Sequence, residues 1–278
     1  YMNPEIRFPL AMIQRVRGFD NDALRYFMNR SMVDKSGLWG ARAEAEFQLL
    51  SPQTGEESEL SRLCPLSIAS CRTAAARPFL DGVLEPEVWE KAERFSLSDR
   101  PQKNAPDPDA NREDLNERFA LSTEFGTFVS FLYDAQFFYI ALECSDIPGA
   151  GPKTQGPRRR DANLDDKDRV EIELDLDRDY TTYYRFLFSR DGDVTDSCWN
   201  RLGWDARCFV AQGGDQGRWT LEIAIPWEDL TRVAPTRTDI WALAVRRIVP
   251  DRGIECWNVE NSDRTEHAFG LLTFGQRP

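Results

Sequence analysis

The stretch DRVEIELDLDRDYTTYYRFLFSRDGDVTD, residues 168–196, contains two runs in which apolar and polar side chains alternate strictly. The apolar side chains of the first run share one face: Val170, Ile172, Leu174 and Leu176. The second run places three aromatic side chains on one face: Tyr184, Phe186 and Phe188. Alternation with a period of two, in runs rich in Val, Ile, Tyr and Phe, is typical of half-buried β-strands. The stretch therefore predicts two neighbouring strands, each with one side that packs in a core.

The polar sides of these two strands form a candidate binding surface. Glu171 and Glu173 occupy the polar side of the first strand, and Arg185 occupies that of the second. A carboxylate and a guanidinium on neighbouring strands form a stabilising cross-strand pair. The arrangement is typical both of a polar binding site and of the solvated face of an ordinary sheet, so both interpretations stay open.

Length and composition predict a globular chain of one or two domains. The chain has 278 residues, of which 12% are aromatic, and it is long enough to bury a large core. Its formal net charge is −12, from 47 acidic and 35 basic residues. A surface of this charge repels phosphate backbones, so nucleic acid is disfavoured as a partner. No apolar run reaches the length of about 18 residues that a membrane span needs.

The cysteines favour an exported protein. Six cysteines without a Cys-x-x-Cys spacing or a neighbouring His argue against zinc and favour disulfides, with buried thiols as the alternative. The locally feasible pairs are Cys198 with Cys208 and Cys64 with Cys71. Because the chain begins at Tyr1 without a Met start, we expect a fragment or a processed product. We expect an extracellular or periplasmic location.

Residues 1–50 carry the spacing of apolar side chains that predicts α-helices. Apolar side chains such as Ile6 and Ile13 fall on one stripe of the first helix, and a third helix is predicted over 38–50. The stretch Gly18–Phe27 resembles the turn and second helix of a tetratricopeptide-type repeat. Because one repeat cannot bury its own apolar face, these helices either end a longer array or dock on the rest of the chain. They are also a candidate surface for other protein domains.

The rest of the chain divides into a linker and a domain of short strands. A polar segment rich in small residues predicts a linker over 51–76, and the second domain is predicted over 77–278. Its predicted strands beyond the central pair are 125–133, 137–144, 207–211, 219–225, 241–249, 254–259 and 269–274. A turn is expected at Gly213–Asp215. Many short strands with turns between them indicate an antiparallel β-sandwich, so the fold class is mainly β with an N-terminal α-helical segment.

Six groups of short motifs follow one another along the second domain. They are Leu80-Asp81-Gly82 with Trp89, Tyr133-Asp134 with Phe138–Ala141, Asp146, Asp168–Leu174, Gly217–Trp227, and Arg247 with Trp257 and Phe269-Gly270. In this order and spacing they resemble the family 9 carbohydrate-binding modules and their DOMON-like relatives, a β-sandwich group that also includes haem-binding cytochrome-type domains. The resemblance covers about residues 77–275 and implies a β-sandwich that binds sugar.

The resemblance also implies a site for the reducing end of a sugar, held between two tryptophans and bound by a Glu, an Arg and an amide. Glu171 matches the Glu and Arg185 the Arg, and both can bind hydroxyl groups through charge-assisted hydrogen bonds. The sequence departs from the pattern, because Asp165 and the loop 258–268 supply no clamping Trp and Val245 supplies no amide. The predicted carbohydrate-binding residues are Glu171, Glu173, Arg185, Arg247 and Trp257, with Trp199 and Trp204 as a replacement platform or as packing residues.

Catalysis and cofactors have weaker signals. His267 is the single histidine and has no nucleophile beside it in a recognisable motif, so we expect no enzyme activity. Four acidic residues before the central strand predict a structural calcium ion, with a solvated loop as the alternative: Asp161, Asp165, Asp166 and Asp168. Haem is not expected, because all four Met residues lie in the helical segment.

The sequence therefore predicts non-catalytic glycan binding by an accessory domain of a larger exported protein, with an oligo- or polysaccharide as its ligand. Two alternatives stay open: a structural or protein-interaction domain that has lost sugar binding, and a haem-binding electron-transfer domain. If the domain binds glycan at this site, replacing Glu171 or Arg185 by Ala abolishes sugar binding without unfolding the domain.

Overall fold

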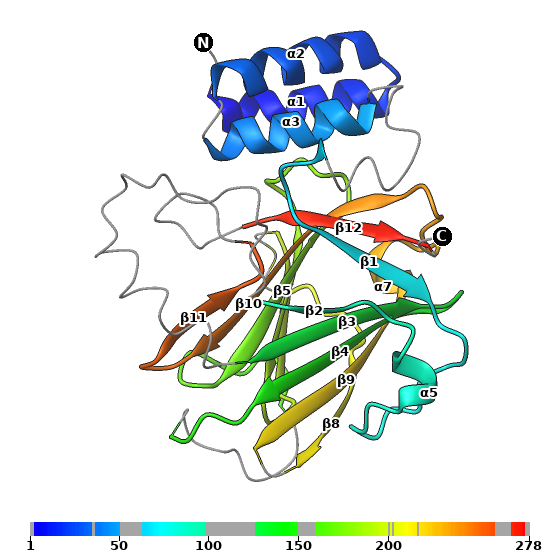
Figure 1. Ribbon diagram of the computed structural model, residues 1–278, viewed down its shortest axis with the longest axis vertical. Coiled ribbons are helices and arrows are strands. Elements are labelled where there is room, and N and C mark those ends of the chain that lie inside the picture. The colour runs from blue at the N-terminus through cyan, green and yellow to red at the C-terminus, as the bar shows by residue number, and fades with distance from the viewer. Residues whose placement is uncertain are drawn as a thin grey trace.

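The computed structural model describes most of the chain, and three helices precede its strands (Figure 1). The described residues are 3–34, 37–50, 63–97, 126–149, 159–199, 201, 203–215, 217–258 and 268–275. The helices are α1 (Pro4–Val16), α2 (Asp20–Val33) and α3 (Leu38–Leu50), with two single-turn helices later in the chain, α5 (Pro86–Trp89) and α7 (Trp227–Leu230). The prediction of a helix over 38–50 is confirmed.

The strands form two β-sheets that pack face to face. The first sheet has the order β7 (Val194–Cys198), β6 (Tyr184–Ser189), β5 (Arg169–Asp175), β10 (Ile240–Val249) and β12 (Gly270–Phe274), with β11 (Gly253–Cys256) paired to β10. The second sheet has the order β3 (Thr127–Tyr133), β4 (Phe137–Ser145), β9 (Arg218–Pro226) and β8 (Phe209–Asp215), with β2 (Arg94–Ser96) paired to β3. Every pair within these two sheets is antiparallel, which confirms the predicted β-sandwich.

A further strand, β1 (Ile68–Thr73), joins the two sheets into one curled sheet of the described strands (Figure 1). It runs parallel to both neighbours, pairing with β12 through Ile68–Cys71 and with β3 through Arg72 and Thr73. The prediction of a linker over 51–76 is therefore wrong for 68–73. Both faces of β1 are covered. Ala69 and Cys71 face the sandwich core, and Ile68 packs beneath the helices.

The main core fills the space between the sheets. The apolar sides of the strands predicted from residues 168–196 lie there, together with the indole rings of Trp219, Trp227 and Trp241. The strands predicted over 125–133 and 137–144 form the hairpin of β3 and β4, and its turn is held by Asp134, whose Oδ1 accepts the N–H groups of Gln136 (2.7 Å) and Phe137 (2.8 Å). The turn expected at Gly213–Asp215 is wrong, because β8 continues through Asp215.

The N-terminal helices dock on the outer face of the first sheet. Phe8, Phe27 and other apolar helix residues pack against Ala242 and Ala244 of β10 and against Phe269. Of the two possibilities left open for this segment, the structure therefore shows the helices docked on the rest of the chain (Figure 1).

A buried ion pair also fixes the docking of the helices. Glu46 of α3 accepts hydrogen bonds from Arg178 Nε (2.6 Å) and Nη2 (3.2 Å), and neither residue is exposed by more than a few per cent. A charge pair removed from water is destabilising when one partner is lost, so this contact ties α3 to the turn after β5.

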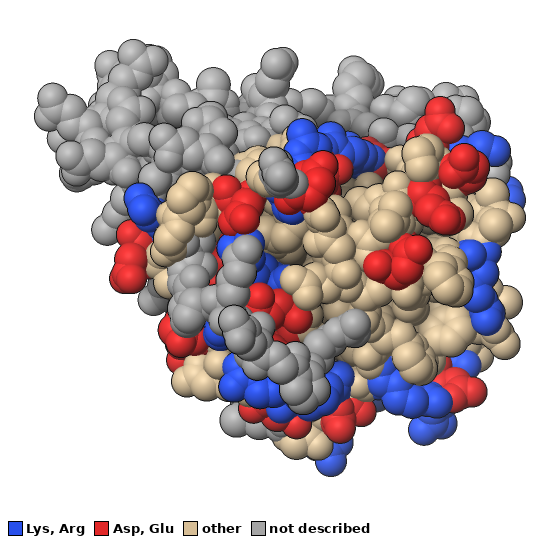
Figure 2. Space-filling view, turned by 90° about the horizontal axis from the view of Figure 1, so that it is seen from below, with Lys and Arg blue, Asp and Glu red and all other residues tan. Residues whose placement is uncertain are grey.

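The outer face of the second sheet is covered by the segment around α5. Glu222 of β9 accepts hydrogen bonds from the N–H groups of Asp81 (3.1 Å) and Gly82 (3.0 Å) and from Trp89 Nε1 (3.0 Å). Gly82 has φ +87° and lies against the backbone of Gly213, where a Cβ would clash, so only glycine fits. On the side of the molecule away from the helices, charged side chains of both signs surround a wide uncharged area (Figure 2).

The cysteines do not form the expected disulfides. Cys198 and Cys208 are thiols, and so is Cys71, the expected partner of Cys64. The second pair is prevented by the sheet itself, because Cys71 lies in the sandwich core and Cys64 lies in the cluster beneath the helices. Burial raises the pKa of the Cys71 thiol well above its ordinary value. None of the described helices is long and apolar enough to cross a bilayer.

Candidate functional site

Charged side chains gather on the outer face of the first sheet, beside the docked helices. Glu171 and Glu173 project from β5, Arg185 from β6, and Arg246 from β10, and we call these four residues with Arg169 the Glu171 cluster. The strand register brings them together, because Arg246 lies opposite Glu171 and Arg185 lies opposite Glu173. Period-two alternation places these side chains on the face away from the core.

Glu171 is the centre of this cluster. Its Oε2 accepts hydrogen bonds from Arg185 Nη2 (2.8 Å) and Arg246 Nε (2.7 Å), and its Oε1 accepts one from Arg169 Nε (3.1 Å). Glu173 Oε1 lies 3.7 Å from Arg185 Nε. The predicted cross-strand pairing of Glu171 and Glu173 with Arg185 is therefore found, and the carboxylate of Glu171 is shared by three guanidiniums.

The charges are held at different depths. The Glu171 side chain is 2% exposed, whereas that of Arg185 is 37% exposed and that of Arg246 is 13% exposed. Burial by itself would raise the pKa of Glu171, but the guanidiniums of Arg246 and Arg185 hold it below its ordinary value. A molecule that approaches this face from water therefore meets the guanidinium of Arg185 before it meets an ionised carboxylate.

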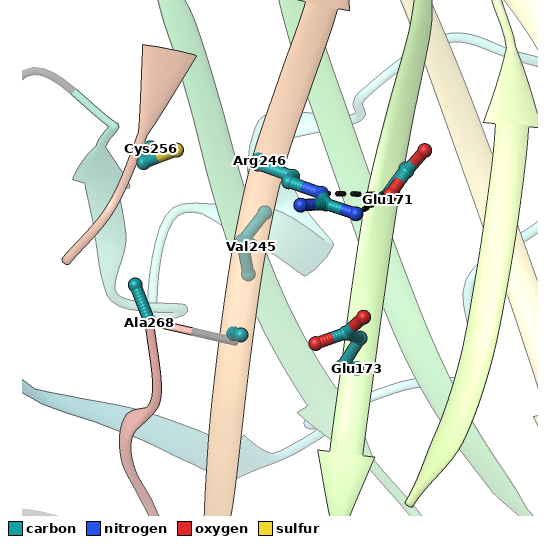
Figure 3. A pocket seen from close by; sticks show the side chains of 7 residues that line it. Glu171, Glu173, Val245, Arg246, Cys256 and Ala268 are labelled. Atoms are coloured by element: carbon teal, nitrogen blue, oxygen red, sulfur yellow. Dashed lines mark hydrogen bonds and ion pairs between the residues drawn. The ribbon is translucent and has the colours of Figure 1, made fainter. Parts of the chain in front are cut away.

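A small pocket opens beside the cluster (Figure 3). Its walls are Glu171, Glu173, Ala244, Val245, Arg246, Cys256 and Ala268. In the close view Arg246 reaches from β10 toward Glu171 on β5, and Glu173 lies below them (Figure 3). The volume of the pocket is about 10 Å³, room for about one water molecule and not for a sugar ring. A larger ligand would have to lie over the rim, where Arg185 is exposed.

Arg247, which the sequence analysis grouped with Glu171 and Arg185, lies on the opposite side of the sheet. It is fully buried between the sheets, and its Nε (2.8 Å) and Nη2 (2.7 Å) donate to the two carboxylate oxygens of Asp168. Its guanidinium also lies over the indole ring of Trp219, 5.3 Å from the centroid. Arg247 therefore braces the interior and does not contribute to the polar face.

Arg246 is one of two cluster residues that the sequence analysis missed, and Arg169 is the other. Trp241, Leu243 and Val245 face the core, so strict alternation along β10 assigns Arg247 to the interior and Arg246 to the outer face. The alternation used for β5 and β6 would have placed Arg246 on the outer face, but not beside Glu171. The motif match instead directed attention to Arg247.

The three predicted tryptophans lie in different places. Trp257 is buried in the sandwich core, with its ring 4.9 Å from that of Phe95. Trp204 packs at the edge of the core, 4.8 Å from the ring of Tyr184. Trp199 is 56% exposed and has a left-handed backbone conformation, φ 52°. Of these three rings, only that of Trp199 is open to a ligand.

The aspartates predicted to bind calcium do not converge on one point. Asp168 is buried and bound to Arg247, while Asp161, Asp165 and Asp166 are exposed. Two carbonyl oxygens of the same loop, those of Leu164 (3.0 Å) and Asp165 (3.2 Å), accept hydrogen bonds from Arg169 Nη1. A guanidinium therefore occupies two of the oxygens that a calcium ion in this loop would need as ligands.

Another acidic group, Asp175, Asp177 and Asp179, lies in the turn after β5. Asp175 accepts the N–H groups of Arg178 (2.8 Å) and Tyr180 (2.6 Å), so its carboxylate stabilises the turn itself. Burial, and then the neighbouring Asp177 and Asp179, raise its pKa well above the ordinary value. His267, the single histidine, lies outside the described residues.

The fold is similar to that of solved carbohydrate-binding proteins. A protein from Bacteroides uniformis for which carbohydrate binding is proposed is 12% identical, with a TM-score of 0.50 over 75% of this chain and 99% of its own. A family 9 carbohydrate-binding module from Caldicellulosiruptor kristjanssonii is 14% identical in two structures. Its complex with glucose has a TM-score of 0.49 and covers 76% of this chain and 97% of the module. Its complex with cellotriose has a TM-score of 0.48 and covers 76% of this chain and 95% of the module.

At this identity the likeness to the Bacteroides uniformis protein shows the class of fold alone, a β-sandwich. No protein-family model matches the chain. No curated protein matches it by sequence.

Proposed function

We propose that this protein binds glycans without catalysis, at the exposed rim of the Glu171 cluster. The observation that carries the proposal is the convergence of Arg185 and Arg246 on Glu171 at the outer face of the sheet, with Arg185 open to solvent. Guanidinium and carboxylate groups held by one another present fixed donors and acceptors, and fixed groups of this kind bind vicinal hydroxyls at a small entropic cost. The likeness of the fold to carbohydrate-binding structures is consistent with this function.

Trp199 is the proposed platform for the sugar ring. It combines a largely exposed indole with a left-handed φ of 52°, a conformation that costs a residue other than glycine roughly 1 kcal/mol or more. A strained and exposed aromatic residue contributes little to stability, so a role in binding accounts better for its presence. Its backbone N–H donates to Tyr183 O (2.8 Å), which places its backbone beside the start of β6, the strand that carries Arg185.

The proposal includes a place in a larger exported protein, where the sandwich would hold a partner domain near its glycan. The thiol state of Cys71, Cys198 and Cys208 removes the disulfides on which that expectation partly rested, so the location stays a prediction. Calcium binding at the predicted aspartates also stays a prediction. Titration with calcium and with a chelator tests it through the melting temperature.

A second candidate, a structural or protein-interaction domain, is favoured by one observation. Glu171 is already neutralised by three arginines, and the pocket beside it holds about one water molecule. A cluster that is satisfied internally can serve only to fix β5, β6 and β10 together.

Calorimetric titration of the whole chain with soluble oligosaccharides, including cellotriose, separates the two candidates. Saturable binding that disappears in Arg185→Ala and persists in Arg207→Ala supports the proposed site. Arg207 is a suitable control, because it is an exposed arginine held by Asp229 outside the cluster. Absence of heat with every sugar, from a folded chain, would favour the interaction domain. Equal losses in both variants would contradict the placement of the site.

A further inference from the structure

The charges of the Glu171 cluster do not cancel. Three guanidiniums, those of Arg169, Arg185 and Arg246, are held within ion-pair distance of two carboxylates, those of Glu171 and Glu173. Because arginine stays protonated at any ordinary pH, the three guanidiniums exceed the two carboxylates even when both carboxylates are ionised, and the cluster carries a surplus of positive charge. This surplus stands out in a chain whose formal net charge is −12.

The surplus charge is on the side that faces water. Glu171 and Glu173 are 2% and 3% exposed, so their carboxylates form the floor of the cluster. Arg185 is the most exposed member: its Nη2 holds Glu171, its Nε is buried and faces Glu173, and its Nη1 has no hydrogen-bond partner among the described residues. The guanidinium is therefore fixed in place and still has donors to offer.

We propose that the preferred ligand of this site is an acidic glycan, whose uronate carboxylate pairs with Arg185 at the rim of the Glu171 cluster. This inference rests on the proposed glycan-binding function and specifies its substrate class. A planar guanidinium matches a carboxylate with two parallel hydrogen bonds and an opposite charge, whereas a neutral hydroxyl offers neither the second bond nor the charge. The partial burial of Arg185 reduces the screening that weakens a fully exposed pair.

The neighbours of Arg185 determine how the ligand is bound. Glu171 and Arg246 hold each other at 2.6–2.7 Å, so Arg246 supports the floor, and Arg185 makes the contact with ligand. Glu173, 3.7 Å from Arg185 Nε, is the group that a ligand carboxylate would compete with. Removing the charge of Glu173 is therefore expected to strengthen binding of an acidic glycan, and this effect is opposite in sign to that of removing Arg185.

The test compares a charged ligand with its uncharged methyl ester. Calorimetry of the whole chain would measure binding of an oligogalacturonate and of the same oligosaccharide with its carboxylates methyl-esterified, at low and at moderate salt. We expect the acidic form to bind roughly tenfold or more tightly than the ester, and its affinity to fall as ionic strength rises. Arg185→Gln should remove the preference for charge, Arg185→Lys should restore part of it, and Glu173→Gln should strengthen binding of the acidic form.

The outcomes distinguish the inference from the function on which it rests. Binding of the ester or of cellotriose as tightly as the uronate would leave glycan binding in place and overturn the acidic preference. No binding of any sugar by a folded chain would overturn both. Equal binding of oligoglutamate would show a site for acidic chains in general and would contradict a glycan ligand. Retention of the charge preference in Arg185→Gln would contradict the role of Arg185.

Discussion

Arg246 and Arg247 are consecutive residues of β10, and their guanidiniums lie on opposite faces of the first sheet. Arg246 donates to Glu171 on the outer face, 2.7 Å away, and Arg247 donates to Asp168 between the sheets, 2.7 Å away. One step along a strand thus separates a residue of the candidate site from a residue of the core. The two positions should respond differently to substitution.

Replacing Arg247 by Met should lower the free energy of unfolding without a specific effect on glycan binding. The substitution leaves the carboxylate of Asp168 buried without its charge partner, which costs about 3–5 kcal/mol. Urea denaturation followed by tryptophan fluorescence measures this loss. The double variant Arg247→Met with Asp168→Leu should recover part of the stability, and a loss below about 1 kcal/mol in the single variant would contradict the buried pair.

Replacing Glu171 by Ala should destabilise the chain, whereas replacing Arg185 by Ala should not. Glu171 is buried and accepts hydrogen bonds from three guanidiniums, so its removal costs roughly 2–4 kcal/mol. Arg185 is partly exposed, and its pair with Glu171 is worth about 1 kcal/mol or less. Glu171→Ala is therefore not the clean test of binding that the sequence suggested. Thermal melts of both variants check this, and equal melting temperatures would show that Glu171 does not organise the cluster.

Glu255 should make stability fall as the pH rises toward neutrality. Burial raises the pKa of this carboxyl, which faces Arg247 and Thr127, to about 7. The folded chain therefore retains a proton that the unfolded chain loses near pH 4.5, and stability from this group decreases between about pH 4.5 and about pH 7. Glu255→Gln should weaken that dependence and be the more stable form at pH 8, by up to about 3 kcal/mol. The test is to measure the urea midpoints of the unchanged protein and of Glu255→Gln across this pH range. If the two midpoints changed in parallel with pH, the role of Glu255 would be contradicted.

Replacing Trp199 by Gly should weaken glycan binding and leave stability unchanged or slightly raised. Glycine adopts the positive φ at this position without strain, and the lost indole is mostly exposed. Loss of a stacking ring costs about 1 kcal/mol or more of binding free energy. Calorimetry and a thermal melt on the same sample separate the two effects. A large drop in the melting temperature would show that Trp199 is a packing residue.

The fragment 77–278, which the sequence predicts as a separate domain, should not unfold as one cooperative unit. It lacks β1, which joins the sheets, and it exposes Ala242, Ala244 and Phe269, which the helices cover. A fragment that begins at residue 63 keeps β1 and isolates the contribution of the helices. Calorimetric melting of both fragments beside the whole chain provides the measurement, and a sharp transition in 77–278 would contradict the integral role of β1.

The parts of the fold that sequence could predict are those that repeat a local pattern. The alternation in β5 and β6 identified their two faces and the pairing of Glu173 with Arg185, and the apolar runs 125–133 and 137–144 identified β3 and β4. β1 escaped detection because Ala69, Ser70 and Cys71 are small on both faces, where the strand is covered by the core and by the helices. Docking of the helices was one of two possibilities in the sequence, and their position on the sheet could not be predicted, because Ala242 and Ala244 do not show what covers them.

The candidate site was predictable in part for the same reason. Pairing across two adjacent strands follows from register, so Glu171 and Arg185 could be brought together from sequence. Arg246 comes from a strand 75 residues away, and only the fold decides that β10 lies beside β5.

The position of β1 has a consequence for how the protein is made. Thr273 of β12 hydrogen-bonds to the carbonyl of Ala69 in β1, 204 residues earlier in the chain. During synthesis β1 therefore leaves the ribosome long before β12. The edge of β1 that pairs with β12 stays open until almost all of the sandwich has emerged. Contacts this distant in sequence are typical of slow folding. The nascent chain should need protection of that edge, and chaperone dependence in cells would follow from the topology alone.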